Sequence, residues 1–176
     1  MNTKLKRTPG IYVVGFMASG KSTVGRHLAH RLGWNFFDTD DEIEAAEKMP
    51  ISEIFAARGE AEFRRIESEI VRQHVRWIER GRPAVVALGG GAFVEPPNRQ
   101  LLAENGISVW LDCPFEVVEK RVAVTSHRPL AHDPGKFAAL YRARREAYAL
   151  AEIHIPIESD DAEVTVEAIV RHPLMR

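Results

Sequence analysis

The segment GFMASGKST, at residues 15–23, matches the phosphate-binding pattern G-x-x-x-x-G-K-[ST]. Its required positions are occupied by Gly15, Gly20, Lys21 and Ser22. The backbone N–H groups of such a glycine loop converge on phosphate oxygens, while the lysine supplies a cation and the hydroxyl a ligand for magnesium. The sequence therefore predicts a phosphate-binding loop here.

Two aspartates, Asp38 and Asp40, follow the apolar run Trp34–Phe37 at a spacing of two residues. If that run is a strand, both carboxylates project from one side of its extended end, next to the ligand crevice of an α/β sheet. One carboxylate of such a pair can help to hold hydrated magnesium, and the other can orient a substrate hydroxyl and receive its proton. Helix capping by Asp40 or Asp41 is the alternative interpretation.

Glycine and arginine residues elsewhere in the chain can contact a ligand. The triplet Gly89–Gly91 follows an apolar run directly, which fits either close approach of backbone to a ligand or a plain tight turn. Composition does not distinguish Arg64 from Arg65 in GEAEFRRIE, and a solvated salt-bridge face is the simpler interpretation there. The segment RARREAYALAE has guanidinium groups that suit a substrate carboxylate or a solvated helix face, at Arg142, Arg144 and Arg145.

Residues 123–136 lose all apolar periodicity and contain Pro129, Pro134 and Gly135, so we expect a mobile loop. Within it, Arg128 can close over a γ-phosphate, stabilise charge during transfer and exclude water. A merely solvated arginine is the alternative, and the catalytic interpretation depends on the phosphate loop beside it.

Short apolar runs, separated by segments of helical periodicity, must position these groups. Runs typical of buried strands occur at 11–14, 84–88, 107–111 and 153–157. The segment Lys21–Leu32 has helical spacing before Gly33. Because strands and helices alternate, we expect a mainly parallel sheet that is covered by helices on both faces.

The region between Ser52 and Ile78 has a helical pattern. Ser52 is the expected N-cap, and Gly59 is an expected break. An apolar side on the helix after the break is marked by Phe63, Ile66, Ile70 and His74. This block is a candidate substrate-binding insertion.

The composition fits one domain without a large charged surface. The 176 residues include 24 Lys and Arg against 25 Asp and Glu, a formal net charge of -1, which argues against nucleic acid or an acidic membrane as partner. The one cysteine, Cys113, cannot form an internal disulfide, and no metal-ligand cluster of Cys and His occurs, which suits a reducing cytosol. Residues 1–9 precede a short apolar run rather than a signal peptide or membrane span, so we expect a cytoplasmic protein.

Together, these segments resemble shikimate kinase along nearly the whole chain and in that family's order. The phosphate loop alone is shared with very many nucleotide-binding proteins, so the combination carries the resemblance. The other family motifs appear as D-x-D at Asp38 and Asp40, G-E-x-x-F-R-x-x-E at Gly59–Glu67, the triple glycine at Gly89–Gly91, R-P-L at Arg128–Leu130 and R-x-x-x-Y at Arg144–Tyr148.

The resemblance implies transfer of the ATP γ-phosphoryl group, with Mg²⁺ bound, to the 3-hydroxyl of shikimate in the pathway to chorismate and aromatic amino acids. It implies a single P-loop kinase domain over residues 1–176, and a monomer. The expected fold is the nucleoside-monophosphate-kinase-like three-layer α/β/α form with a five-stranded parallel sheet. Its parts would be a phosphate loop at 15–23, a helical substrate-binding region at about 38–67 and a mobile lid at about 123–136.

The resemblance also assigns roles by position. Catalysis would involve Lys21, Asp40 and Arg128. ATP would be bound by Gly15, Ala18, Ser19, Gly20, Lys21, Ser22, Thr23, Arg121 and Arg128. Arg121 would stack on adenine, with residues 159–162 on the other side of the base. Shikimate would contact Asp40, Arg64, Gly89, Gly90, Gly91 and Arg144, and magnesium would be bound by Ser22 and Asp38.

The chain departs from the family pattern at two places. Ala18 replaces a glycine of the phosphate loop, which is tolerable if φ is negative there. The lid reads RPLA rather than the common RPLL. In addition, Asp112 rivals Asp38 for magnesium because it also follows an apolar run, although it can instead cap the helix after Pro114.

Two other functions remain open from the sequence. A kinase for another small hydroxy acid, such as gluconate, would share the fold but would need a pocket without two arginines around one carboxylate. A non-catalytic shikimate-sensing domain would be indicated by loss of Lys21, Asp40 or Arg128, and all three are present.

Overall fold

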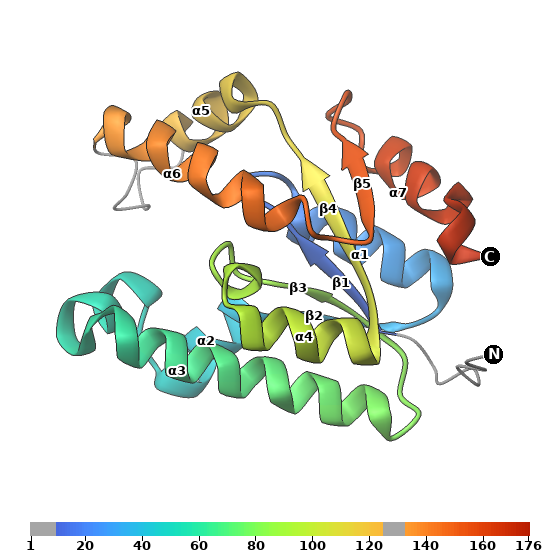
Figure 1. The fold of residues 1–176 in the computed structure, drawn as a ribbon, viewed down its shortest axis with the longest axis horizontal. Helices are drawn as coiled ribbons and strands as arrows, with labels where there is room; N and C mark the ends of the chain where they lie inside the picture. Colours follow the sequence, from blue (N-terminus) through green and yellow to red (C-terminus); the bar gives the residue numbers. More distant parts are fainter. Residues whose placement is uncertain (1–9, 125–132) are drawn as a thin grey trace.

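The computed structural model describes residues 10–124 and 133–176, which fold around a five-stranded parallel sheet (Figure 1). The strands are β1 (Gly10–Val14), β2 (Asn35–Asp38), β3 (Ala84–Ala87), β4 (Gly106–Asp112) and β5 (Ile153–Pro156). The helices are α1 (Lys21–Leu32), α2 (Thr39–Glu47), α3 (Ile51–Glu79), α4 (Pro96–Asn105), α5 (Phe115–Val124), α6 (Pro134–Tyr148) and α7 (Ala162–Arg171), with 3-10 turns η1 (Ala92–Val94) and η3 (Pro173–Met175).

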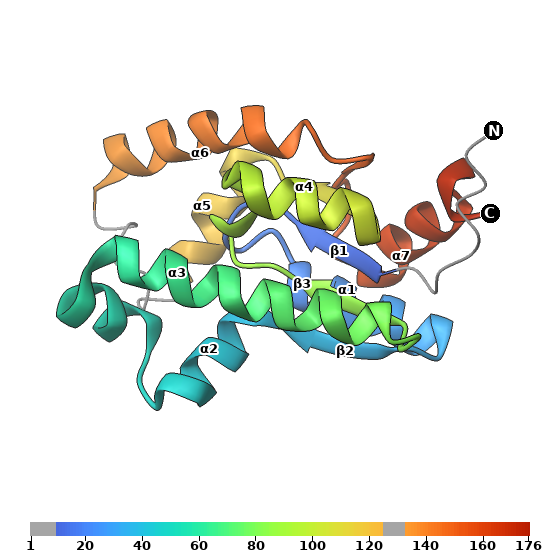
Figure 2. The same cartoon turned by 60° about the horizontal axis from the view of Figure 1, so that its bottom comes forward.

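The sheet has the strand order β2-β3-β1-β4-β5, so β1 lies in its centre. β1 and β3 are buried along their whole length, as expected for parallel strands that are covered on both faces. α1 and α7 pack together on one face, and α3 and α4 pack together on the other (Figures 1 and 2). The predicted three-layer α/β/α fold with a five-stranded parallel sheet is therefore confirmed.

The parallel strands bring their carboxyl ends to one edge of the sheet. The register pairs Ala87 of β3 with Val13 of β1 and with Asp38 of β2, and it pairs Val14 with Trp110 of β4. The segments that follow these ends are the phosphate loop, the two aspartates and the glycine triplet. Residues far apart in the sequence thus meet at this edge.

Local patterns predicted most of the elements well. The helix at Lys21–Leu32 has the predicted bounds, and Gly33 ends it in the left-handed conformation at φ 68°. The five strands lie at the predicted runs, with bounds that differ by one residue or so at either end.

The first turn of α3 differs from the expectation. The helix begins at Ile51 after Pro50, which occupies the N-cap position in an extended conformation, so the prediction of Ser52 as N-cap is wrong. The side chain of Glu44 accepts a hydrogen bond from the Ile51 N–H at 3.0 Å and satisfies this helix end from α2. The predicted break at Gly59 is confirmed, since φ 81° and ψ 169° interrupt the helix there.

Among the described residues, the buried apolar side chains form two separate clusters. The larger one surrounds the sheet. The smaller one joins α2 to α3 and consists of Ile43, Ile54, Phe63, Ile66 and Ile70. The predicted apolar side of α3 is buried, including His74, which is hydrogen-bonded to Glu42 of α2.

The predicted loop at 123–136 is too wide at both ends. α5 continues to Val124, and α6 begins at Pro134 because Asp133 caps it by accepting from the Lys136 N–H at 3.1 Å. Residues 125–132 of the predicted lid, with Arg128 among them, lie outside the described residues. Within residues 10–124 and 133–176, no helix combines the length and the apolar composition of a membrane span.

Candidate active site

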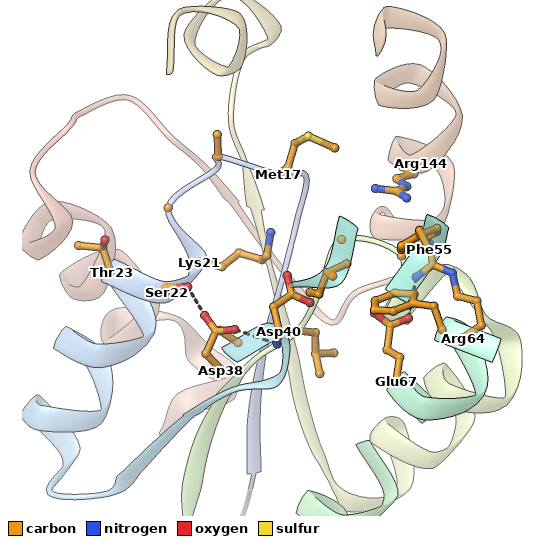
Figure 3. Close-up of a pocket in the computed structure, with 18 residues that line it drawn as sticks. Met17, Lys21, Ser22, Thr23, Asp38, Asp40, Phe55, Arg64, Glu67 and Arg144 are labelled. Carbon is orange, nitrogen blue, oxygen red and sulfur yellow. Dashed lines mark hydrogen bonds and ion pairs between the residues drawn. The ribbon is translucent and has the colours of Figure 1, made fainter. Parts of the chain in front are cut away.

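A cavity of about 330 Å³ opens at the carboxyl edge of the sheet (Figure 3). Its wall is formed by the phosphate loop with the start of α1, the end of β2 with the start of α2, α3 on both sides of its kink, the end of β3 with the glycine triplet, and α6. Asp40 lies between Lys21 on one side and Arg64 and Arg144 on the other (Figure 3). The cavity therefore brings a phosphate-binding loop, a carboxylate and two guanidinium groups together.

The phosphate loop follows β1 and leads into α1. Its lysine, Lys21, donates hydrogen bonds to the carbonyl oxygens of Gly15 and Phe16, each at 2.9 Å. These bonds tie the side chain across the loop. The start of α1 adds the unpaired N–H groups and the positive dipole end that attract phosphate. The predicted ATP-binding residues that line the cavity are Ala18, Gly20, Lys21, Ser22 and Thr23, whereas Gly15 and Ser19 lie outside its lining.

The backbone at Ala18 differs from the expectation. Its φ is 60°, in the left-handed region. The alanine was expected to be tolerated only at a negative φ, so this expectation is not met. A non-glycine residue in this conformation costs about 1 kcal/mol or more. Arg121 of α5 donates to the Ala18 carbonyl oxygen at 2.9 Å and so supports this conformation.

Arg121 connects three segments. Besides Ala18, it contacts Asp160, at 2.9 Å between Nη2 and Oδ1, in the segment that follows β5. It does not line the cavity. The sequence placed Arg121 and residues 159–162 on two sides of an adenine base, and the structure places them next to each other and to the phosphate loop.

Asp38 and Asp40 reach the cavity from a helix end rather than from an extended strand. Asp38 is the last residue of β2 and the N-cap of α2, and its Oδ1 accepts from the N–H groups of Asp40 at 3.0 Å and Asp41 at 3.3 Å. The cap is thus Asp38, and the alternative of capping by Asp40 or Asp41 is wrong. Asp40 lies in the first turn of α2, so the two carboxylates do not project from one extended end, yet both line the cavity.

The second oxygen of Asp38 accepts a hydrogen bond from the hydroxyl of Ser22 (Figure 3). The described part of the chain contains no group of three or more His, Cys, Asp and Glu side chains that could hold a metal ion. Two adjacent oxygen donors beside a phosphate loop suit magnesium, which keeps several waters and completes its ligands with phosphate oxygens. The rival residue Asp112 does not line the cavity and is bonded to Arg145 and His154 instead.

The choice between Arg64 and Arg65 depends on the tertiary structure. Arg65 is 65 % exposed and pairs with Glu62 on the surface of α3. Arg64 is only 18 % exposed, lines the cavity and lies 2.7 Å from Glu67, between Nη1 and Oε1. Arg64 is therefore the residue of this motif that faces the site.

Glu67 is a member of the site to which the sequence analysis assigned no role. Its side chain is 1 % exposed, and its Oε2 has no hydrogen-bond partner among the described residues. Burial raises the pKa of Glu67, against the opposing effect of the Arg64 cation. A signal was available, because Glu67 lies four residues after Phe63 and three before Ile70, on the buried side of α3.

The glycine triplet lies under these charged side chains. A Cβ atom at Gly89 would lie 2.5 Å from Asp40 Oδ1, and one at Gly91 would overlap the Arg64 guanidinium. The Gly89 N–H donates to Thr39 Oγ1 at 3.0 Å, which joins the triplet to α2. Gly90 and Gly91 line the cavity, and Gly89 lies just outside its lining. The absence of side chains thus makes room for the charged groups of the site.

The three arginines of α6 lie in different surroundings. Arg142 is exposed, Arg145 is bonded to Asp112, and Arg144 lines the cavity. One turn after Arg144, Tyr148 donates a hydrogen bond to the Gly90 carbonyl oxygen, and burial raises the pKa of Tyr148 to about 12. α6 is thereby joined to the glycine triplet.

The cavity also has an apolar wall that the sequence analysis did not identify. It is formed by Ile51 and Phe55, from the part of α3 before the kink, together with Phe63. The rings of Phe55 and Phe63 lie 4.5 Å apart between centroids. A ligand of this cavity therefore meets charge on one side and apolar surface on the other.

Comparisons with known proteins agree with this geometry. The family model of shikimate kinase matches residues 17–173 of the chain. Shikimate kinase from Moorella thermoacetica is 42% identical over 164 residues, which cover 92% of each chain. The enzyme of that name from Ruegeria pomeroyi is 42% identical over 163 residues, 91% of this chain and 80% of the other.

A solved structure, shikimate kinase from Acinetobacter baumannii in complex with shikimate, superposes with a TM-score of 0.85 at 36% sequence identity. The superposition covers 93% of this chain and 91% of that one. Sequence and structure thus agree over almost the whole chain, and the chain belongs to the shikimate kinase family.

Proposed function

We propose that this protein transfers the γ-phosphoryl group of ATP to the 3-hydroxyl of shikimate, giving shikimate 3-phosphate and ADP. The observation that carries the proposal is that a single cavity is lined by the phosphate loop and by Arg64 and Arg144, with Asp40 between them. Donor and acceptor would therefore meet across one carboxylate. Such positioning can account for much of the rate of a phosphoryl transfer.

The acceptor side fits a small hydroxy acid. Arg64 and Arg144 approach the cavity from different helices, so their guanidinium groups can hold one carboxylate between them. Glu67 holds Arg64 in place, and its second carboxylate oxygen is available to accept from a substrate hydroxyl. Gly90 and Gly91 allow the ligand to approach the backbone closely.

The donor side fits the phosphates of ATP. Lys21 and the N–H groups of the loop would offset the charge on the β- and γ-phosphates, and Arg128 would add to this from the segment outside the described residues. Ser22 and Asp38 would hold magnesium, which supplies further charge neutralisation on the phosphate oxygens when bound. Arg121 and residues 159–162 would contact the adenine base.

Asp40 is the proposed catalytic carboxylate. It would orient the 3-hydroxyl for in-line attack on the γ-phosphorus and accept its proton as the new bond forms. Lys21 and Arg128 would stabilise the charge on the transferred group. The whole of residues 1–176 would act as one kinase domain, as a cytoplasmic monomer.

Release of ADP by the purified protein tests the proposal. ATP and magnesium are supplied with and without shikimate, and gluconate and nucleoside monophosphates serve as alternative acceptors. Strong stimulation by shikimate alone is the expected result. Tight ATP binding with no stimulation by shikimate would contradict the proposal and would favour another acceptor or a sensor.

A further inference from the structure

A cluster of charged and aromatic side chains lies outside the cavity, where β4 ends against α6. Its centre is Asp112, the last residue of β4, with a side chain that is 15 % exposed. Arg145 of α6 donates to both carboxylate oxygens, with Nη2 3.1 Å from Oδ2. His154 of β5 is hydrogen-bonded to the same carboxylate at 2.8 Å and stacks on Trp110 at a ring-centroid distance of 4.3 Å.

Arg145 also contacts the aromatic side chains of Trp110 and Tyr141. Its guanidinium carbon lies 4.9 Å from the centroid of the Trp110 ring, and its Nη1 lies 3.1 Å from the hydroxyl of Tyr141. Tyr141 in turn donates to the carbonyl oxygen of Cys113, just after β4, at 2.6 Å. α6 is therefore joined to the end of β4 by both an ion pair and a chain of hydrogen bonds.

The charge state of Asp112 supports this anchoring. Partial burial acts to raise the pKa of Asp112, but the hydrogen bonds from Arg145 and His154 outweigh it and hold the pKa below its ordinary value. The carboxylate is thus ionised at neutral pH and bonded through both of its oxygens.

A different face of the same helical turn points into the cavity. Arg144 precedes Arg145 by one residue, so the two side chains leave α6 about 100° apart. Arg144 lines the cavity, and Tyr148 on the next turn is bonded to Gly90. A small rotation or slide of α6 therefore moves the Arg144 guanidinium relative to the glycine triplet.

We propose that Asp112 is a positioning residue for the acceptor: it anchors Arg145 and thereby fixes where Arg144 meets the substrate carboxylate. This inference rests on the proposed function. Asp112 does not line the cavity, so its effect on the acceptor would pass through Arg145 to the neighbouring Arg144 on α6. It also holds Arg145 outside the cavity, which leaves Arg144 as the guanidinium of this pair that reaches the substrate.

Steady-state kinetics of Asp112→Ala, Arg145→Ala and the double variant test the proposal. Each single substitution is expected to raise the KM for shikimate about three- to tenfold. The KM for ATP should stay within about twofold, because Phe16 of the phosphate loop packs on the Tyr141 ring of α6, a contact that does not require the Asp112–Arg145 ion pair. The double variant should be no worse than either single one, since the same interaction is lost. Arg142→Ala, at an exposed position on α6, is the matched control and should change neither constant.

The outcomes separate this inference from the proposed function. A wild-type protein that shikimate does not stimulate contradicts the proposed function. A stimulated wild type whose single variants keep the wild-type KM for shikimate, or raise both Michaelis constants equally, overturns the positioning role alone.

Amide hydrogen exchange adds a readout that needs no substrate. Asp112→Ala should speed exchange within residues 134–148 and leave α1 at the wild-type rate. Unchanged protection of α6, or an equal loss in α1, would also count against the positioning role.

Discussion

Two arginine–carboxylate pairs of the molecule, Arg64–Glu67 and Arg145–Asp112, differ in how many of the carboxylate oxygens accept a hydrogen bond. Glu67, in the wall of the cavity, bonds Arg64 through one oxygen, and its other oxygen has no hydrogen-bond partner in the described part of the chain. Asp112, at the end of β4, is bonded through both oxygens to Arg145 of α6 and His154 of β5. Burial raises the pKa of Glu67, whereas the hydrogen bonds of Asp112 outweigh burial and lower its pKa.

The difference indicates what each pair is for. A buried oxygen without a partner costs free energy in the folded chain, and a substrate hydroxyl can relieve that cost on binding. Both oxygens of Asp112 already accept hydrogen bonds, so neither is left unpaired for a ligand. These bonds instead join the end of β4 to α6 and β5. In the proposed function, the first pair would serve substrate recognition, and the second would fix the position of α6 against β4.

The largest expected effect is on Asp40, the proposed catalytic carboxylate. Asp40→Asn should lower kcat about a hundredfold or more, because the proton acceptor for the hydroxyl is lost. ATP affinity should remain nearly intact, and Asp41→Asn, at the exposed neighbouring position, should keep wild-type turnover. Rapid-quench or coupled assays measure turnover, and a normal rate in Asp40→Asn would refute the catalytic role.

The next effect compares neighbouring arginines of α6. Arg144→Ala should weaken shikimate binding by about 2 to 4 kcal/mol, because a charge-assisted bond to the carboxylate is lost in the cavity. Arg145→Ala should cost clearly less, since Arg145 acts only on the position of its neighbour. Calorimetric titration with shikimate gives both values, and equal losses would mean that the two arginines do not differ in role.

The two carboxylates should give stability profiles of opposite slope. The lowered pKa of Asp112 means that its contribution is complete above its ordinary pKa of 3.8 and is lost as the pH falls through the lowered value. The raised pKa of Glu67 means that folding stability is lost as the pH rises from 4.5 through the raised value.

Urea unfolding between about pH 3 and about pH 7 measures these slopes. The free energy of unfolding of wild type should exceed that of Asp112→Asn by about 1 kcal/mol at neutral pH. The difference should be smaller at acid pH. The free energy of unfolding of wild type relative to Glu67→Gln should instead decline as the pH rises. Parallel curves for the three proteins would remove the distinction between the pairs.

The smallest effect concerns backbone strain beside the site. Ala18→Gly should stabilise the fold by about 0.5 to 1 kcal/mol. Glycine adopts a positive φ without steric cost, and the greater entropy that glycine loses on folding offsets part of this gain. Lys48→Gly, at φ 54° and at the end of α2, is the matched control away from the phosphate loop. Thermal unfolding measures both, and a destabilised Ala18→Gly beside a stabilised control would show that the alanine methyl group packs usefully.

Local signals predicted the fold and the phosphate loop because they need only neighbouring residues. The strands and α1 follow from apolar periodicity, and the loop follows from glycine and lysine spacing. Asp38 as the cap was missed because capping depends on where β2 ends. The preference for Arg64 over Arg65 depends on the rotation of α3 relative to the cavity.

Other features of the site needed contacts between distant segments. The left-handed Ala18 is supported by Arg121, about a hundred residues later, so a loop sequence by itself could not show it. The bonding of Asp112 likewise involves α6 and β5, and the sequence could offer it only as a rival metal ligand or a helix cap. The role of Glu67 was within reach, since a carboxylate on the buried side of a helix requires a partner.

The small cluster of Ile43, Ile54, Phe63, Ile66 and Ile70 is separate from the core around the sheet. It supports the apolar wall of the cavity, and Gly59 divides the helix that carries this wall. The α3 part of the cavity wall thus packs separately from the phosphate loop, whose Phe16 belongs to the core around the sheet. Repacking these five side chains should therefore reshape the α3 wall of the cavity and leave the packing around the phosphate loop unchanged.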